Sequence, residues 1–368
     1  MSHAQFMRSH WQKSPLLVRG AFPDFSRKQE PFVPADVLAL ARNEDAESRL
    51  VTRDRGKWAL QHGPFRPSLL RSLGSRNWTI LVQDTQHFSQ RSEALLARFA
   101  FIPHVRVDDL MVSLAAEGGG VGAHVDSYDV FLIQGRGRRR WRISGQPDTE
   151  FRPGLPLKIL KDFRPEQEWV LESGDMLYLP PGYAHDGVAL DECLTYSVGF
   201  RAPTHQDWIE SFLDQRRDAI CVAGQYADPE LRPTRHPGEI PPGVISGLDA
   251  ALRAARWSRL DVRLAAGRFL TEPKSHVLFN PAMNSLSAAD FARNCTKHGL
   301  HLDGRTRMAY SEDWVFINGE SIQFNSTRDA CLQTLADLRH LPPGKPSRPA
   351  LDLLLNWYEC GYLHVQSA

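Results

Sequence analysis

Several features that mark particular classes of protein are scarce or absent in this sequence. The five cysteines are scattered and odd in number, and no CxxC pair suggests a zinc site. No apolar run approaches the roughly 20 residues that span a bilayer, and the polar start MSHAQFMRSHWQKS lacks the apolar stretch of a signal peptide. We therefore expect free thiols, no membrane span and a cytoplasmic location.

An excess of charge of one sign is also lacking. The formal net charge is +1, so binding to nucleic acid or to a membrane would need a local patch. Hydrophobic residues make up 42% and charged residues 24% of the chain, as in ordinary globular proteins. At 368 residues the chain is long enough for two or three structural units.

The pattern of hydrophobic residues divides the chain into four segments and predicts an α+β fold. Residues 1–90 mix helical patterns with one short apolar strand, WTILVQ, and we expect a lead-in packed on the next unit. Residues 91–204 have the short β-type runs of a small barrel or sandwich: VDDLMVSLAA, SYDVFLIQ, RRRWRI, DMLYLP and LTYSVGF. Residues 205–268 are helical, in DWIESFLDQRRDAI and GVISGLDAALRAARWSRL. Residues 269–368 mix helices with a hairpin, RTRMAY then WVFING, as in a small winged-helix-like domain.

Three residues form a candidate metal site. In AHVDSYDVFLI, His124 and Asp126 stand two apart at the start of an expected strand, so both side chains leave the same face. His185 follows the turn Pro-Pro-Gly in LPPGYAHDGV, at an expected strand entrance. Two imidazoles and one carboxylate suit non-haem iron(II), because they fill one face of the metal and leave the other open. An HxD pair alone is more often an ordinary polar pair, but the glycine-rich lead-in GGGVGAH and the distal PPGYAH favour the metal site.

A buried arginine is expected near this site. In the strand RRRWRI, Arg139 shares a face with Trp141 and Ile143, and the other arginines lie on the opposite face. An arginine that points into the barrel needs a partner for its charge, and a metal-bound dicarboxylate supplies one through bidentate hydrogen bonds. We therefore predict that Arg139 binds the distal carboxylate of 2-oxoglutarate. The outer arginines form either a solvated face or a surface for nucleic acid.

Other polar side chains gather on the same strand faces. By alternation, Asp109, Met111 and Ser113 lie on one face of VDDLMVSLAA, Tyr128 is in line with the HxD pair, and Ser197 lies on the matching face of the last strand. These residues can assemble a polar barrel mouth. Asp109 is either a partner for a cationic substrate side chain or a charge at a strand edge.

The runs HVDSYDVFLIQGRGRRRWRI, GDMLYLPPGYAHDGVAL and TYSVGFRAP closely resemble the bacterial JmjC-type ribosomal oxygenases, the ribosomal protein arginine hydroxylases. The resemblance implies a double-stranded β-helix, the JmjC/cupin barrel, then a helical dimerisation region and a C-terminal winged-helix domain, in a homodimer. It also implies iron(II) as cofactor, 2-oxoglutarate and dioxygen as co-substrates, and hydroxylation of an arginine at its β-carbon. The implied substrate is a large-subunit (50S) ribosomal protein, the one numbered sixteen.

The resemblance also assigns roles to individual positions. The implied iron ligands are His124, Asp126 and His185, and Arg139 is the implied 2-oxoglutarate ligand. The positions expected to line an arginine pocket are Asp109, Met111, Tyr128 and Ser197. Some relatives have a serine that assists the co-substrate where this chain has Ala115, so Ser113 or another hydroxyl group is expected to substitute.

Other functions stay open on the sequence alone. A JmjC histidine hydroxylase or demethylase acting on another protein would use the same metal and co-substrate, although an acidic pocket favours arginine. A non-catalytic cupin binding module would more often close its metal site with four protein ligands. We expect no direct reading of nucleic acid by the C-terminal domain, because its sequence has mixed charge and no basic stripe.

Overall fold

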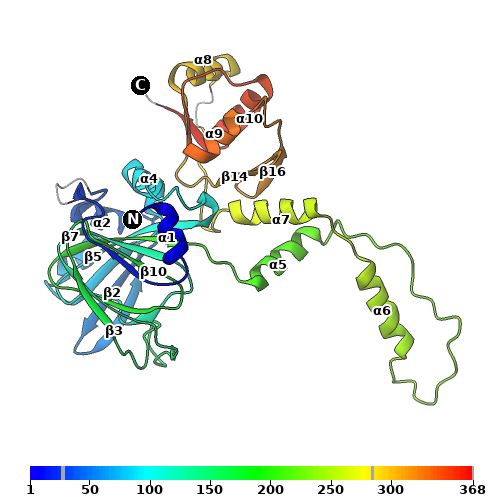
Figure 1. Cartoon of the computed structure of the whole chain (residues 1–368), viewed down its shortest axis with the longest axis horizontal. Helices are drawn as coiled ribbons and strands as arrows, with labels where there is room; N and C mark the ends of the chain where they lie inside the picture. The colour runs from blue at the N-terminus through cyan, green and yellow to red at the C-terminus, as the bar shows by residue number, and fades with distance from the viewer. Residues whose placement is uncertain (26–29, 283–285, 367–368) are drawn as a thin grey trace.

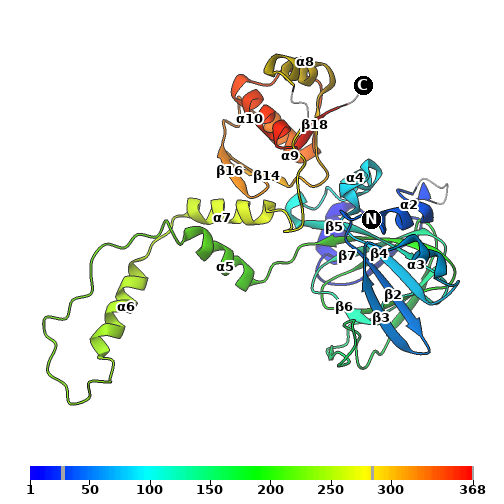
Figure 2. The same cartoon turned by 180° about the vertical axis from the view of Figure 1, so that it is seen from behind.

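The chain forms a β-barrel, a helical arm and a small C-terminal domain. The computed structural model describes residues 1–25, 30–282 and 286–366. Figure 1 shows the C-terminal domain above the barrel and helix α7, with helix α6 at the far end of an arm that points away from the barrel. Figure 2 shows the same arrangement from behind, and in both views α6 stands apart from the barrel.

The larger of the two barrel sheets has eight antiparallel strands. Their spatial order is β1 (Leu16–Val18), β10 (Met176–Leu179), β7 (Val130–Arg136), β12 (Cys193–Phe200), β5 (Val107–Ala115), β4 (Trp78–Val82), β2 (Ser48–Asp54) and β3 (Lys57–His62). The expectation of one strand in residues 1–90 was wrong, because β1, β2 and β3 join β4 in extending this sheet. The N-terminal segment is therefore part of the barrel wall.

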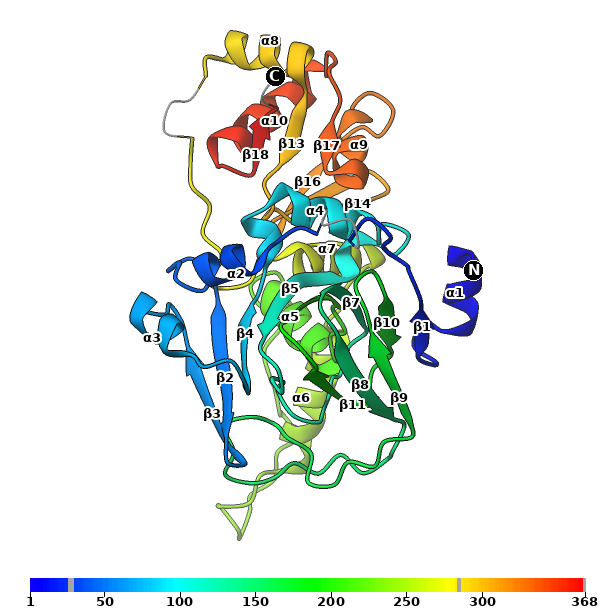
Figure 3. The same cartoon turned by 90° about the vertical axis from the view of Figure 1, so that its left-hand side faces the viewer.

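The smaller sheet carries the two histidines of the candidate metal site. Its order is β6 (His124–Val125), β11 (Ala184–Ala189), β8 (Arg139–Ser144) and β9 (Gln167–Leu171). The predicted strand SYDVFLIQ was too long at its start, because β6 ends at Val125 and β7 begins at Val130. Between them the chain crosses from the small sheet to the large one, and Figure 3 shows the strands from the side.

Residue Asp129 anchors this crossing. Its buried carboxylate accepts hydrogen bonds from the Tyr178 hydroxyl at 2.6 Å and from Nε2 of Gln12 at 2.9 Å. Its carbonyl accepts a bond from the amide of Phe200 at 3.0 Å. A carboxylate buried in this way keeps its place only with such partners, so the residues on either side of the crossing are fixed.

The alternation predicted for β5 is confirmed. Leu110, Val112 and Leu114 are buried in a large cluster on the outer face of the sheet, together with aromatic residues of the N-terminal segment such as Phe6 and Phe22. The intervening residues face the space between the two sheets. The elements that flank the sheet are α1 (His3–Ser9), α2 (Pro34–Leu40), α3 (Pro67–Ser72), α4 (Gln90–Ala97) and the 3-10 turns η2 (Thr85–His87) and η3 (His104–Arg106).

The helical arm consists of α5 (His205–Arg216), α6 (Pro242–Ala254) and α7 (Arg259–Thr271). The single helical run expected through GVISGLDAALRAARWSRL is broken between α6 and α7. Ser258 is the N-cap of α7. Its side chain accepts a hydrogen bond from the amide of Asp261, and the Asp261 carboxylate accepts one from the Ser258 amide, so the new helix begins here. The expected division at residue 268 falls inside α7, and the four segment boundaries stay a prediction.

The C-terminal domain contains the expected helices and hairpin. Its elements are α8 (Ala288–His298), β13 (Leu300–Leu302), β14 (Met308–Ser311), β15 (Trp314–Ile317), β16 (Glu320–Gln323), α9 (Cys331–Leu338), β17 (His340–Leu341), α10 (Arg348–Glu359) and β18 (Leu363–Val365). A core of its own, around Phe291 and Trp357, holds them together. The five cysteines are free, as expected, and no helix among the described residues is long and apolar enough to cross a membrane.

Candidate active site

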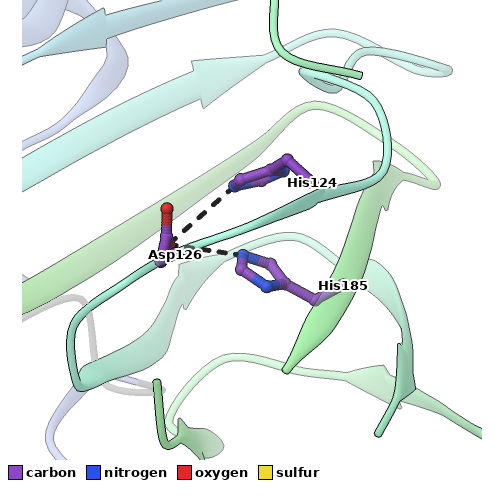
Figure 4. A group of neighbouring side chains, drawn as sticks. All are labelled: His124, Asp126 and His185. Atoms are coloured by element: carbon purple, nitrogen blue, oxygen red, sulfur yellow. Dashed lines mark ion pairs between the residues drawn. The ribbon is translucent and has the colours of Figure 1, made fainter. Parts of the chain in front are cut away.

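The predicted metal ligands converge at the edge of the small sheet. His124 and His185 are directly opposite each other in the pairing of β6 with β11, so their side chains leave the same face. Oδ2 of Asp126 lies 3.9 Å from Nε2 of His124 and 3.6 Å from Nε2 of His185. One ligand atom from each residue lies within 4.8 Å of the others, and Figure 4 shows the three side chains pointing toward one another.

Hydrogen bonds to the backbone orient both imidazoles. Nδ1 of His124 lies 2.9 Å from the carbonyl of Gly122, and Nδ1 of His185 lies 3.0 Å from that of Tyr183. A carbonyl can only accept, so each Nδ1 donates and each Nε2 keeps its lone pair for a metal. Burial and the neighbouring His124 lower the pKa of His185, which favours the neutral ring that a metal requires. The third ligand is placed through its backbone, since the Gly182 amide donates to the Asp126 carbonyl at 2.9 Å.

A cavity of about 250 Å³ opens beside these ligands, between the two sheets. It is lined by every residue for which the sequence predicted a role at the site. These residues are Asp109, Met111, Ser113, His124, Asp126, Tyr128, Arg139, His185 and Ser197. Ala115 is not among the lining residues and lies buried against Ala189 and Cys193.

One end of the cavity presents hydrogen-bond donors that have no acceptor. Arg139 is only 5% exposed, and its Nη1 donates to Oγ of Ser113 at 3.2 Å. Nε and Nη2 of Arg139, Oγ1 of Thr79 and Nε1 of Trp141 are buried without a hydrogen-bond partner among the described residues. Leaving such groups unpaired is costly, and a carboxylate accepts several bonds at once. The residues present therefore fit a small dicarboxylate such as 2-oxoglutarate.

The other end of the cavity presents a carboxylate. Asp109 is 7% exposed and accepts only long bonds, from Nε2 of Gln83 at 3.4 Å and from the amide of Asp84 at 3.5 Å. Burial raises the pKa of Asp109 to about 6. Gly199 stands opposite on β12, where a Cβ would lie 3.2 Å from Oδ1 of Asp109 and 3.8 Å from the ring of Tyr128. The absence of a side chain there leaves room for a group bound between them.

Two family profiles and several known proteins match this chain. The family profile described as JmjC domain matches residues 94–208, and the one described as ROXA-like winged helix matches residues 254–364. The chain is 40% identical to "Ribosomal protein uL16 3-hydroxylase" of Escherichia coli over 95% of this chain and 87% of the relative. It is 38% identical to "Probable ribosomal oxygenase" of Haemophilus influenzae over 98% of this chain and 95% of that one.

The chain belongs to the JmjC-type ribosomal oxygenases. A solved ribosomal oxygenase of Escherichia coli in complex with cobalt and 2-oxoglutarate is 32% identical, covers 99% of this chain and 98% of its own, and superposes with a TM-score of 0.85. The same enzyme in complex with cobalt and succinic acid gives the same TM-score. The predicted fold, a JmjC/cupin barrel followed by a winged-helix domain, is thus confirmed.

The structure of the present chain departs from the sequence prediction at Tyr128. This residue does not continue a strand with His124 and Asp126, because it lies in the bend where the chain crosses between the sheets. It is 39% exposed at the cavity mouth. Burial of its hydroxyl and the carboxylate of Asp126, to which that hydroxyl is hydrogen-bonded, raise the pKa of Tyr128 above its ordinary value.

Sequence reasoning missed five polar residues that line the cavity of this chain: Arg49 on β2, Thr79 on β4, Gln83 just after β4, Asp108 on β5 and Lys158. Alternation in WTILVQ places Thr79 and Gln83 on one face, which is the signal that could have found them. The sequence does not reveal that β4 pairs with β5, with Thr79 opposite Ala115. Without that pairing, neither residue could be assigned to the cavity.

The ligand cluster predicts how the protein binds divalent cobalt, a spectroscopic substitute for iron(II). We expect Asp126→Ala to weaken cobalt(II) binding by about a hundredfold or more, because even loss of a residue that supports a ligand costs about ten- to a hundredfold. Titration followed by visible absorption or calorimetry measures this. Asp162→Ala, which removes an exposed aspartate elsewhere, is the matched control and should bind as the unaltered protein does. Equal affinity in both variants would contradict the assigned cluster.

Proposed function

We propose that this ribosomal oxygenase is an iron(II)- and 2-oxoglutarate-dependent protein hydroxylase that modifies the β-carbon of an arginine in the large-subunit ribosomal protein uL16. The observation that carries the proposal is a single cavity with an HxD…H ligand cluster, unpaired donors at one end and a buried carboxylate at the other. The Escherichia coli relative named for uL16 3-hydroxylation supports the substrate.

We assign the metal to His124, Asp126 and His185. Bound iron(II), together with dioxygen and 2-oxoglutarate, supplies the oxidising chemistry, in which the co-substrate becomes succinate and carbon dioxide and one oxygen atom enters a C–H bond. The chain's own residues hold the three ligands in register and keep the imidazoles neutral and correctly turned. Three protein ligands leave open positions, whereas a purely structural site is more often closed by four.

We assign the distal carboxylate of 2-oxoglutarate to Arg139, with Ser113 and Thr79 beside it. Arg139 offers two unpaired nitrogens, and Ser113 holds the third through its hydroxyl. Thr79 stands directly across from Ala115 in the β4–β5 pairing, with its hydroxyl buried and unpaired. Its place supports a role as the hydroxyl donor that compensates for the missing serine at Ala115.

We assign the substrate arginine to Asp109, Met111, Tyr128 and Ser197. A guanidinium group donates in a planar fork that matches a carboxylate, and Asp109 has unused acceptor capacity because its present bonds are long. Met111 and Tyr128 offer apolar surface for the methylene groups of the same side chain. A histidine substrate would need no carboxylate, so the buried Asp109 favours arginine.

We further propose that the protein acts as a homodimer in the cytoplasm. On α6, three apolar residues spaced along one helix face are more than half exposed: Ile245 at 56%, Leu248 at 58% and Leu252 at 67%. The helix stands away from the barrel in Figure 1 and Figure 2. A contiguous exposed apolar stripe on a projecting arm is typical of a surface that another chain covers, and a second copy of this chain offers the same stripe.

The proposed reaction is tested by mass spectrometry of uL16 after incubation with the purified protein, iron(II), 2-oxoglutarate and oxygen. We expect one arginine to gain one oxygen atom, and His124→Ala to abolish the gain because a metal ligand is lost. Lys345→Met, an exposed change elsewhere, should retain the activity. Succinate formation without a modified arginine would reject this substrate and keep the oxygenase. No turnover at all would favour a non-catalytic binding protein.

The role of Thr79 is tested by Thr79→Val, which removes the hydroxyl and keeps the shape. A hydrogen bond to a charged group contributes about 1.5–3 kcal/mol, so we expect the affinity for 2-oxoglutarate to fall about tenfold or more. Calorimetry on cobalt-loaded protein measures this without turnover. Thr52→Val, on the neighbouring strand β2 and outside the cavity lining, is the control. Unchanged affinity of Thr79→Val would reject the assignment.

The dimer is tested by the double variant Leu248→Asp, Leu252→Asp. Charges on the apolar stripe would be buried unpaired in the dimer, so we expect light scattering to report a monomer where the unaltered protein is a dimer. Leu338→Asp, on the exposed part of α9, should leave the mass unchanged. A double variant that stays dimeric would place the contact elsewhere, and a monomeric unaltered protein would reject the dimer.

A further inference from the structure

Two neighbouring aspartates at the start of β5 connect the cavity with the C-terminal half of the chain. Asp109 faces the cavity and is the residue assigned to the substrate arginine. Asp108 also borders the cavity, and its carboxylate meets three cations that come after the last barrel strand, β12. They are Arg201 at 3.4 Å, Lys274 at 3.5 Å and Arg307 at 3.6 Å. The strand that carries Asp109 is thus held where it begins.

Lys274 supplies a positive charge near Asp109, where it pairs with Asp84. It follows α7, its side chain is 21% exposed, and its Nζ lies 3.1 Å and 3.2 Å from the two carboxylate oxygens of Asp84. Asp84 is buried, and its amide lies 3.5 Å from Oδ2 of Asp109. Lys274 is therefore one residue removed from the carboxylate that faces the cavity.

Arg307 holds the backbone of the same strand. This residue immediately precedes β14 of the C-terminal domain, and its guanidinium donates to the carbonyl of Val107 at 3.1 Å and to that of Asp108 at 2.8 Å. Its own amide is bonded to the Asn318 side chain at 2.9 Å. The C-terminal domain thereby holds Val107 and Asp108, the two residues before Asp109, by hydrogen bonds to their backbone carbonyls.

We propose that Lys274 is a positioning residue through which the C-terminal half of the chain orients Asp109 and balances its charge for the substrate arginine, on a strand whose start is held by Arg307. The inference rests on the proposed function, since it takes Asp109 as the partner of that arginine. It gives the C-terminal domain a part in substrate binding that needs no nucleic-acid contact.

The charges around Asp109 determine how the binding of an arginine should depend on pH. Asp109 faces Lys274 from the segment after α7, Asp84 before η2, Asp108 on its own strand and the hydroxyl of Tyr128. Burial is the main cause that raises the pKa of Asp109 to about 6, Lys274 lowers it, and the two other aspartates raise it. Removing Lys274 raises that pKa further, so a smaller fraction of Asp109 is ionised near neutral pH. Arginine binding, which needs the ionised form, then appears only at higher pH.

The experiment compares Lys274→Met, Lys274→Gln and Lys274→Arg in the full-length chain, with Lys345→Met as an exposed control. The probes are a uL16 peptide with its target arginine and the same peptide with citrulline, a neutral isostere. Peptide binding is measured by calorimetry on cobalt-loaded protein, and KM and kcat are measured on the iron-loaded protein across acidic to alkaline pH.

We expect Lys274→Met and Lys274→Gln to weaken arginine-peptide binding several-fold at acidic pH, where a higher pKa leaves less of Asp109 ionised, and by less than about twofold at alkaline pH, where Asp109 is ionised in every variant. The preference for arginine over citrulline should shrink, the rise of binding with pH should move to higher pH, and the KM for 2-oxoglutarate should stay within about twofold. Lys274→Arg should restore binding because the charge returns. Lys274→Gln can still bond to Asp84, so it decides the outcome if Lys274→Met does not fold.

Two distinct failures can be told apart. If the unaltered protein binds arginine and citrulline peptides equally, the assignment of Asp109 fails and the proposed substrate fails with it. If the unaltered protein prefers arginine and the Lys274 variants keep that preference and its pH profile, only the positioning role is overturned. A parallel rise in the KM for 2-oxoglutarate would also overturn it, because general damage to the barrel would then explain the loss.

Discussion

The whole active site depends on one crossing of the chain between the two barrel sheets. In the small sheet, β6 holds His124 in register with His185 and ends at Val125, and Val130 begins β7 in the large sheet. Between them, Asp126 is fixed by the amide of Gly182, and Asp129 is fixed by buried hydrogen bonds. A metal site of three side chains has little tolerance for movement, and here hydrogen bonds from the turn before β11 and from strands of the large sheet hold the connecting segment.

This crossing also explains why the cavity has two different ends. The small sheet contributes Arg139, and the large sheet contributes Thr79 at the same end and Asp109 at the other. Although the net charge is only +1, one cavity contains the metal ligands, the acidic Asp109 and donors that have no partner among the described residues. Such a site can bind an acidic co-substrate and a cationic side chain at once, and each ligand compensates a buried group that would otherwise be costly.

The sequence predicted the residues whose position follows from strand alternation alone. Arg139 was placed correctly inside the barrel because a strand sends alternate side chains to opposite faces, and Asp109, which the sequence left open between a pocket residue and a strand-edge charge, also lines the cavity. Thr79 was missed because its role depends on the pairing of β4 with β5, which is a long-range contact. The end of β6 at Val125 was missed because Tyr128 and the run VFLI favour a strand, and the crossing is set by tertiary bonds to Asp129.

The contacts of the C-terminal domain bear on how its fold should be interpreted. A winged helix is often associated with nucleic acid, but fold alone does not establish function. In this chain, Arg307 is directed at the carbonyls of β5, and Arg339 donates to the carbonyls of Asp303 and Thr306. These guanidinium groups are committed to backbone acceptors within the protein, so they are not free for phosphates. The bonds of Arg307 reach the start of β5, the strand that carries Asp109, so the domain contacts the barrel there.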